Sequence, residues 1–250
     1  MWFPRVSLIG LLVVAFACGG STKPSTLSST WVPPAILAQV PADSPYVFAT
    51  LQPVSEKLRE RMMGPFNQQV GELLKKAALI QPEDRPSLPS YLRAALALAD
   101  ELRGKTPKQW WSELGFDPRG LFVLYGLSVW PVARMEIADP ARLRGVLERM
   151  AAASGVTPQR GTLEGRAYWS LGTPDVTVVV AVLEREAVVA LLPTPAVATS
   201  LPLVLGTQKP ARPLGTTSTV TDLLARHQFT NLGLGYFDLR LALALLTGPS

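Results

Sequence analysis

The sequence predicts an α+β domain, in which an antiparallel sheet of hairpins is covered on one face by amphipathic helices. Two predicted hairpins support this class. One spans Gly161–Leu171 and turns at Glu164-Gly165, and the other joins 176–182 to 187–192 across a charged tip. The order strand, polar or proline break, amphipathic helix recurs in three segments: 46–63, 133–150 and 236–246. This recurrence raises the hypothesis of a repeated strand–helix unit.

Before residue 120 the sequence predicts one strand followed by helices. The strand is 46–51, a run of aromatic and β-branched residues that follows a turn. Apolar residues at helical spacing predict helices in these segments: 53–63, 66–77, 91–102 and 106–114. We expect Gly64-Pro65 to separate the first two helices, because proline removes a helical hydrogen bond. The proline-rich stretch 81–89 is expected to be a loop.

Strands predominate after residue 120, beginning with the apolar run 121–125 and a turn at 126–128. The next run, 132–137, alternates between apolar and charged residues. Successive side chains of a strand point to opposite faces of the sheet. We therefore expect three residues to face the core, namely Ala133, Met135 and Ile137. Arg134 and Glu136 are then expected to face solvent.

The remaining helices follow from capping and spacing signals. Asp139-Pro140 provides a capping carboxylate and a first-turn proline, and Gly155 can close the helix that follows. Helical spacing predicts another helix at 218–227. The apolar run 232–239 is expected to be a strand that leads into an apolar helix from Arg240.

The amino-terminal segment has the features of an export signal. Arg5 precedes the apolar run 6–16, which is too short to span a bilayer. Small residues then precede Cys18, the single cysteine of the chain. This pattern resembles the signal sequence and lipobox of bacterial lipoproteins, which implies cleavage after residue 17 and acylation of both the thiol and the new amine of Cys18. The alternative is an ordinary secretory signal that leaves Cys18 as an amino-terminal thiol.

Three parts of the chain follow from this interpretation. Residues 1–17 are the lipoprotein signal peptide, and 18–35 are a flexible tether rich in serine, threonine and proline. Residues 36–250 form the α+β domain. The apolar segment 239–246 is followed by only four residues, so either its helix docks on the sheet or the domain is truncated at its carboxyl end.

Composition excludes several classes of function. One cysteine and one histidine leave no side chains for disulfides, thiolate clusters or a two-histidine metal site in the folded part, so we expect no metal and no cofactor. The net charge of +5 is mild, and the basic residues are interleaved with acidic ones. A nucleic acid partner is therefore not expected, because phosphate binding needs a concentrated basic surface.

The sequence contains no motif that assigns a catalytic residue. The sequence does not exclude a hydrolytic triad formed by Ser218, Asp222 and His227. The alternative is that His227 has a structural role, at the surface or in a helix cap, which is more common for a lone histidine. Asp139 and Asp238 are expected to cap helices. The acid pairs Glu83-Asp84 and Asp100-Glu101 are expected to face solvent.

Large aromatic residues are expected in the core, with an apolar or carbohydrate groove as the alternative: Trp110, Trp111, Trp130, Tyr168 and Trp169. Of the adjacent Trp110 and Trp111, only one is expected to be fully buried.

Five short segments carry a resemblance to a known family: Val40–Ala49, Tyr125–Leu127, Pro131–Glu136, Ala138–Pro140 and Gly235–Arg240. They resemble uncharacterised proteobacterial lipoproteins whose mature region begins with a valine-proline-alanine-aspartate turn. The resemblance implies an α+β domain of unknown function, and the relatives are longer at the carboxyl end. Because this family has no assigned activity, the resemblance implies no catalytic residue.

These inferences predict a lipid-anchored lipoprotein of the cell envelope with a non-catalytic binding or scaffolding domain. Gly19, rather than aspartate, follows Cys18, which favours the outer membrane, facing the periplasm. The expected partners are the membrane, through the acyl chains, and a protein or apolar ligand of unknown identity. Two alternatives remain: a metal-independent periplasmic hydrolase that acts on envelope material, and a carrier of an apolar ligand.

Overall fold

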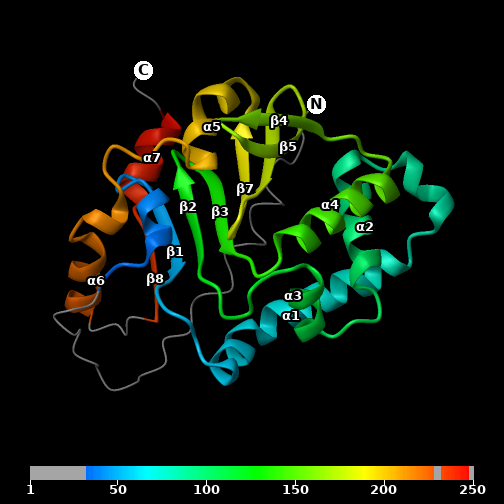
Figure 1. The fold of residues 1–250 in the computed structure, drawn as a ribbon, viewed down its shortest axis with the longest axis horizontal. Coiled ribbons are helices and arrows are strands. Elements are labelled where there is room, and N and C mark those ends of the chain that lie inside the picture. The colour runs from blue at the N-terminus through cyan, green and yellow to red at the C-terminus, as the bar shows by residue number, and fades with distance from the viewer. Residues whose placement is uncertain (1–31, 228–231, 248–250) are drawn as a thin grey trace.

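The computed structural model describes residues 32–227 and 232–247, which form an α+β domain around an antiparallel sheet (Figure 1). The predicted fold class is thereby confirmed. Eight strands of the described residues pair in the order β4-β5-β6-β7-β3-β2-β1-β8, and every pair is antiparallel. Their bounds are β1 Tyr46–Thr50, β2 Phe122–Leu127, β3 Trp130–Glu136, β4 Gln159–Leu163, β5 Arg166–Gly172, β6 Val176–Val182, β7 Glu186–Pro193 and β8 Gly233–Phe237.

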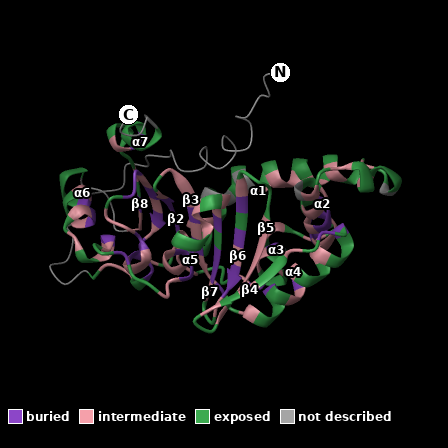
Figure 2. Cartoon of the chain, turned by 90° about the horizontal axis from the view of Figure 1, so that it is seen from above, coloured by how far each residue is buried: buried purple, intermediate pink, exposed green. Residues whose placement is uncertain are grey.

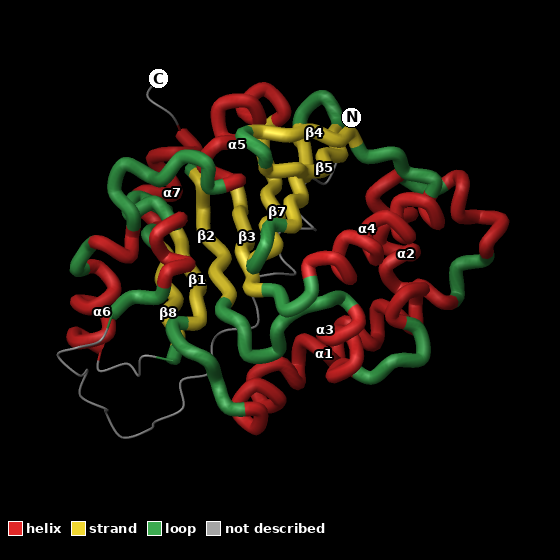
Figure 3. Tube along the Cα trace, in the orientation of Figure 1, coloured by secondary structure: helices red, strands yellow, loops and turns green. Residues whose placement is uncertain are grey.

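Most of the long helices lie to one side of this sheet. In Figures 1 and 3, α1 to α4 lie together on one side of the strands and α6 lies on the other. The bounds are α1 Glu56–Ala78, α2 Ser90–Leu102, α3 Pro107–Glu113, α4 Pro140–Ser154, α5 Val197–Leu205, α6 Thr219–His227 and α7 Leu239–Thr247. The described part of the chain also contains four short 3-10 helices, at Ala35–Gln39, Pro82–Ser87, Thr194–Ala196 and Leu214–Thr216. Within the described ranges, no helix combines the length and the apolar character needed to cross a bilayer.

Local turn chemistry explains the hairpins. Glu164 and Gly165, with φ of 48° and 80°, make the two-residue connection between β4 and β5. Positive φ at both central residues matches the twist of the flanking strands. The hairpin of β6 and β7 also forms as predicted, from Val176 to Pro193. β2 continues through Gly126 to Leu127, so its turn with β3 lies slightly later than predicted, at Ser128.

Two helical predictions are wrong. Gly64-Pro65 does not break the chain into two helices, because α1 runs through both residues. Gly64 lacks the Cβ that would meet the proline ring, and proline costs this exposed stretch of helix one backbone hydrogen bond, to the carbonyl of Arg61. The stretch 81–89 includes a 3-10 helix rather than being loop throughout. In addition, α5 forms in a proline-containing segment for which the sequence analysis predicted no element.

One face of the sheet, here called the closed face, carries the main core. α5, α6 and the 3-10 helices at 35–39 and 214–216 cover it, and their buried apolar residues join those of the strands. The strand residues of this core include Val47, Val123, Val132, Val179, Val188 and Leu234. In Figure 2 the purple of buried residues is concentrated in these strands, whereas α1 is mostly green or pink.

The opposite face, here called the open face, is covered mainly at one edge. α4 places Leu143 against Ile137, Val182 and Ala187 in a second, smaller apolar cluster. Further along this face Val178 and Val189 keep 36% and 43% of their surface exposed. The helical cover predicted for one face is therefore concentrated on the closed face, with α4 adding a local contact on the other.

The orientation predicted for β3 is wrong for Arg134. The alternation correctly grouped Ala133 with Met135, and Arg134 with Glu136, on opposite faces. However, Arg134 points into the closed face and is fully buried. On the open face Ala133 and Met135 lie only half-buried, whereas Ile137, just after the strand, is buried against Leu143 of α4 as predicted. Alternation identifies residues that share a face, but it does not show which face the helices cover.

The buried Arg134 is fully partnered. Its guanidinium donates a 2.8 Å hydrogen bond to Glu186 of β7 and bonds of 3.0 and 2.6 Å to the carbonyls of Leu203 and Val204. A longer contact, of 3.4 Å, reaches the hydroxyl of Tyr125 on β2. The last carbonyls of a helix have no partner within the helix and attract positive charge. Arg134 therefore caps α5 while joining β2, β3 and β7.

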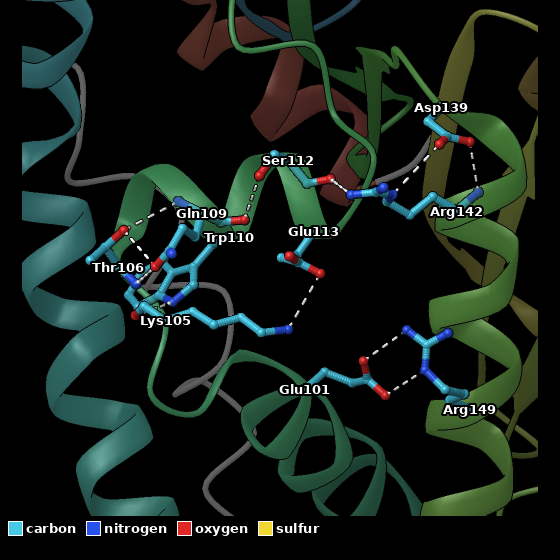
Figure 4. Close-up of polar contacts among 10 residues, drawn as sticks. All are labelled: Glu101, Lys105, Thr106, Gln109, Trp110, Ser112, Glu113, Asp139, Arg142 and Arg149. Atoms are coloured by element: carbon cyan, nitrogen blue, oxygen red, sulfur yellow. Dashed lines mark hydrogen bonds and ion pairs between the residues drawn. The ribbon is translucent and has the colours of Figure 1, made fainter.

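Polar contacts hold α2, α3 and α4 together (Figure 4). Arg149 of α4 donates two hydrogen bonds of 2.9 Å to the carboxylate of Glu101 in α2. Arg142 of α4 donates to the backbone carbonyl of Ser112 in α3, at 3.1 Å. Lys105 and Glu113 form a looser pair at 3.5 Å. Because most of these groups are exposed, each pair contributes little stability by itself.

We predict that Arg134→Met lowers the free energy of unfolding by about 3 kcal/mol, because it leaves Glu186 unpaired and removes the guanidinium donor from the carbonyls of Leu203 and Val204. Urea denaturation monitored by circular dichroism measures this change. The matched control is Arg160→Met, in which an exposed arginine 3.8 Å from Glu148 is removed, with an expected change within about 0.5 kcal/mol. Equal effects of the two substitutions would contradict the assigned role of Arg134.

The Arg149–Glu101 contact predicts a pH effect. The hydrogen bonds from Arg149 lower the pKa of the Glu101 carboxyl, so Arg149→Gln should return this pKa toward its ordinary value of about 4.3. A carboxyl with a lowered folded-state pKa stabilises the fold above its ordinary pKa, and this contribution is lost as the pH falls through the folded value. The contribution stays below about 1 kcal/mol because Arg149 is 59% exposed.

A carboxyl-carbon NMR titration of Glu101 measures the pKa directly, and urea denaturation near neutral and near acidic pH measures the stability. The wild type should lose more stability on acidification than Arg149→Gln. Arg160→Gln is the control that should leave the Glu101 titration unchanged. An unmoved Glu101 midpoint in Arg149→Gln would show that the contact is not formed in solution.

Candidate ligand-binding pocket

A pocket of about 590 Å³ lies where α6, the end of β8, the start of α7 and the turn before β1 meet. Its lining combines charged, hydroxyl-bearing and aromatic side chains. The lining residues are Ala42, Ser44, Thr219, Asp222, Leu223, Arg226, Tyr236, Phe237, Asp238, Leu239, Arg240 and Leu241. This size falls within the range of roughly 300–1,000 Å³ that is typical of small-molecule sites.

Helical spacing places one wall of the pocket. Residues Thr219, Asp222, Leu223 and Arg226 follow the i, i+3, i+4, i+7 pattern and therefore share one side of α6. Val220 and Leu224 lie on the neighbouring side and are buried in the core of the closed face. The burial of these two residues fixes the rotation of α6 and so directs the pocket-lining residues toward β8 and α7.

On the opposite wall of the pocket, Asp238 connects the start of α7 to the turn before β1. As the sequence predicts, its carboxylate caps α7, accepting a 2.9 Å hydrogen bond from the backbone N–H of Leu241. Its own backbone N–H donates to the carbonyl of Pro45 at 2.6 Å. This second bond ties the start of α7 to the turn that carries Ser44.

Two hydroxyl groups of the lining are enclosed without a partner. Ser44 is only 3% exposed, and neither its Oγ nor the hydroxyl oxygen of Tyr236 has a hydrogen-bond partner in the described structure. Burial, together with smaller contributions from the charges of Asp238 and Asp43, raises the pKa of Tyr236 to about 12. The Tyr236 hydroxyl is therefore protonated at neutral pH and can donate a hydrogen bond. Enclosed polar groups without partners are uncommon because they lose their hydration.

The charged side chains of the lining differ in how they are engaged. Asp222 accepts a 2.6 Å hydrogen bond from Ser218, and Asp238 is engaged in its helix cap. Arg226 and Arg240 lie on α6 and α7, and neither guanidinium group has a hydrogen-bond or ion-pair partner in the described part of the chain. These two guanidinium groups are the unused hydrogen-bonding groups that the pocket presents to solvent, because the hydroxyl oxygens of Ser44 and Tyr236 are enclosed.

The structure does not assemble the triad that the sequence left open. Ser218 precedes the first residue of α6, and the exposed His227 is its last. Nine residues of helix correspond to about 13 Å along the axis and to opposite sides of the helix. The Ser218 hydroxyl donates to Asp222 instead. Of the three residues, only Asp222 lines the pocket.

The other acidic candidates have structural roles. Glu83 and Asp84 are exposed, as expected. Asp100 is not simply solvated, because it accepts hydrogen bonds from Arg85 and Arg103, and the Arg85 contact lowers the pKa of its carboxyl. Glu101 pairs with Arg149. Asp139 caps α4 through a 2.8 Å bond from the backbone N–H of Arg142, as predicted.

The large aromatic residues do not form a common groove. Trp110 is buried and donates to the carbonyl of Lys105, while Trp111 is half-buried against Phe116, so the expectation of one buried tryptophan is confirmed. The other three are split between the two apolar clusters. Trp130 and Tyr168 pack against the core of the closed face, and Trp169 packs near α4.

Sequence reasoning singled out Asp222 and Asp238 in this pocket but missed Ser44, Arg226, Tyr236 and Arg240. No local signal marks these four residues, because they come from separate segments. Cys18 lies outside the described residues. Within 32–227 and 232–247, no group of three or more His, Cys, Asp or Glu side chains is placed to hold a metal ion.

Comparison of the chain with protein-family models, with curated proteins and with solved structures found no match.

We predict that Tyr236→Phe leaves the free energy of unfolding unchanged or raises it by up to about 1 kcal/mol, because it removes an enclosed hydroxyl that has no partner. The matched control is Tyr125→Phe, which removes a buried hydroxyl contacted by Arg134 and should lower stability by about 1 kcal/mol. Thermal and urea denaturation compare the two variants. A marked loss of stability in Tyr236→Phe would show that its hydroxyl has a partner in the free protein.

Proposed function

We propose that this chain is a lipid-anchored lipoprotein of the cell envelope whose α+β domain binds a small polar ligand and does not convert it. The pocket carries the binding part of the proposal. Its lining carries Arg226 and Arg240, exposed side chains whose guanidinium groups have no hydrogen-bond or ion-pair partner in the described part of the chain. Convergent polar groups in a concave site are the usual features of ligand recognition.

The hydrogen bonds and protonation of the acidic and hydroxyl side chains in the pocket favour ligand binding over catalysis. A nucleophile needs an adjacent base to remove its proton. Both carboxylates of the lining are already engaged, Asp222 by Ser218 and Asp238 by the cap of α7. The raised pKa of Tyr236 keeps its hydroxyl protonated, so this residue can orient a ligand but is a poor base at neutral pH.

Cys18 carries the anchoring part of the proposal. It is the only cysteine of the chain, and it follows a segment with the composition of an export signal. Several acyl chains anchor a protein stably, whereas one chain binds only marginally. By the sequence interpretation, residues 18–35 connect this anchor to the domain. The domain would therefore work close to the membrane, and we propose the periplasmic side of the outer membrane.

A second candidate, carriage of an apolar ligand, is favoured by the open face of the sheet. Val178 and Val189 remain partly exposed there, and α7 exposes Leu239, Leu243 and Leu246. Exposed apolar surface of this kind is one feature of binding sites for apolar partners. The pocket is the stronger candidate, because two guanidinium groups and two carboxylates border one open depression of the surface.

The test uses protein extracted from membranes. We predict that the mature chain begins at Cys18, carries acyl chains by mass spectrometry, and partitions into detergent, whereas Cys18→Ser partitions into the aqueous phase. Native mass spectrometry of the same preparation should detect a small polar molecule bound in equal amount to wild type and Cys18→Ser. An unacylated wild-type protein would contradict the anchoring, and a co-purified lipid or apolar molecule would favour the second candidate.

A further inference from the structure

We propose that α7 is a second membrane contact of this protein, through exposed leucines that insert into the interface of a phospholipid bilayer. The inference rests on the proposed anchoring through Cys18 and goes beyond it, because it assigns a lipid-contacting surface to the folded domain. Three observations carry it: an exposed row of leucines, the short length of α7, and the place at which the chain from Cys18 enters the domain.

One side of α7 is apolar and exposed. Leu239, Leu243 and Leu246 keep 61%, 51% and 67% of their surface exposed, and their i, i+4, i+7 spacing places them on one side of the helix. Ala242 is buried and Leu241 half-buried, so a different side of α7 faces the domain. In Figure 2 α7 is largely green and projects from the strands at the edge of the molecule. The leucine stripe, as the three exposed residues are called below, therefore points away from the core of the protein.

The shape of this surface favours a bilayer over a small apolar ligand. A helix that projects into solvent encloses no volume, so a single apolar molecule on the leucine stripe would keep most of its own surface in water. In the interface of a bilayer, by contrast, a helix lies in the membrane plane with its apolar side toward the acyl chains. The exposed leucines lose their contact with water there, which is favourable for apolar surface.

The length of α7 suits a helix that lies on a bilayer. Its nine residues correspond to about 13 Å of helix, whereas the hydrocarbon core of a bilayer is about 30 Å thick. Arg240 follows the first leucine of the stripe and lies about 100° away from it around the helix axis. An arginine in this position keeps its guanidinium among the headgroups while the leucines insert. That guanidinium has no hydrogen-bond or ion-pair partner in the described residues, so it is available to headgroup phosphates.

The acidic side chains beside α7 do not repel a bilayer. Asp238 is engaged in the cap of α7, and Asp222 of α6 accepts a hydrogen bond from Ser218. Arg226 and Arg240 border the same depression, so the two positive charges offset the two negative ones. A bilayer that contains anionic lipids therefore meets no net repulsion at this end of the domain.

The chain from Cys18 enters the domain beside α7. The turn before β1 borders the same depression as the start of α7, and the carbonyl of Pro45 in that turn accepts a 2.6 Å hydrogen bond from the backbone N–H of Asp238. In Figure 1 the blue start of the described chain and the red α7 lie at the same end of the molecule. From Cys18 to Val32, the first described residue, covalent geometry limits the chain to about 50 Å. An acylated Cys18 therefore holds α7 near the bilayer, where the high effective concentration populates even a weak contact.

The test uses the full acylated protein in vesicles of phosphatidylethanolamine and phosphatidylglycerol. Leu243→Cys supplies a thiol in the leucine stripe for an environment-sensitive fluorophore, and Ala153→Cys supplies one at an exposed position of α4 as the control site. Acylation blocks the thiol of Cys18, so the dye reacts only at the introduced cysteine. Nitroxide groups on lipid acyl chains quench only a fluorophore that reaches them. We expect quenching at least ~3-fold stronger at position 243 than at position 153, with blue-shifted emission at position 243.

Variants test the leucines themselves. In protein labelled at position 243, the pair of substitutions Leu239→Gln and Leu246→Gln should remove most of the quenching, because the helix loses its apolar contact with the bilayer. Glutamine is a good helix former and both leucines are exposed, so the thermal midpoint measured by circular dichroism should stay unchanged. The matched control is Leu92→Gln, which removes an exposed leucine of α2 at the other end of the molecule in Figure 1 and should leave the quenching unchanged. The comparison of positions 243 and 153 needs neither glutamine, so it stands even if the double variant unfolds.

The outcomes separate this inference from the proposed function. Equal quenching at positions 243 and 153, in protein whose Cys18 is acylated, would overturn the membrane contact and leave the anchoring in place. Unchanged quenching in the folded double glutamine variant would also overturn it. Blue-shifted emission without lipid quenching, lost when the protein is diluted among vesicles, would assign the leucine stripe to a second copy of the chain and overturn the inference as well. Uptake of the dye by the wild type would instead reveal a free Cys18 thiol and contradict the proposed anchoring.

Discussion

The burial of one guanidinium group, that of Arg134, constrains most of this fold. A charge is tolerated inside a protein only where hydrogen bonds and an opposite charge replace its hydration. The partners of Arg134 are Glu186 on β7 and two carbonyls at the end of α5. These groups have to be in place together, so the pairing of β3 with β7 and the position of α5 depend on each other. With nine residues, α5 is too short to be stable alone.

The closed face and the open face follow from this arrangement. Arg134 directs its own side of β3 toward α5, and the apolar residues on that side of the sheet are covered by α5, α6 and the adjoining 3-10 helices. The opposite side has α4 at one edge and partly exposed valines elsewhere. Buried ionic groups contribute more to the choice of one arrangement than to net stability. In this domain, the burial of Arg134 selects the face of the sheet on which α5 packs.

The pocket depends on the same closed face. Val220 and Leu224 bury one side of α6 in the core, and that burial presents Asp222 and Arg226 to β8 and α7. The bond from Asp238 to Pro45 brings the turn with Ser44 to the same place. Ser44 and Tyr236, which border this pocket, carry two of the six enclosed side-chain polar atoms without a partner in the described residues. Departures of this kind from good local hydrogen bonding are expected at functional sites.

The sequence by itself determined the α+β class, the two hairpins, the caps at Asp139 and Asp238 and the helix at 218–227, because each depends on residues a few positions apart. It also supplied the hypothesis of an acylated Cys18, which lies outside the described residues. Only the tertiary structure decided that Arg134 faces inward, that α1 continues through Pro65, and that Ser44, Arg226, Tyr236 and Arg240 line one cavity. The physical reason is distance along the chain. Periodicity and capping act within a few residues, whereas the face that becomes buried and the side chains that meet in a pocket are set by packing between segments far apart in sequence.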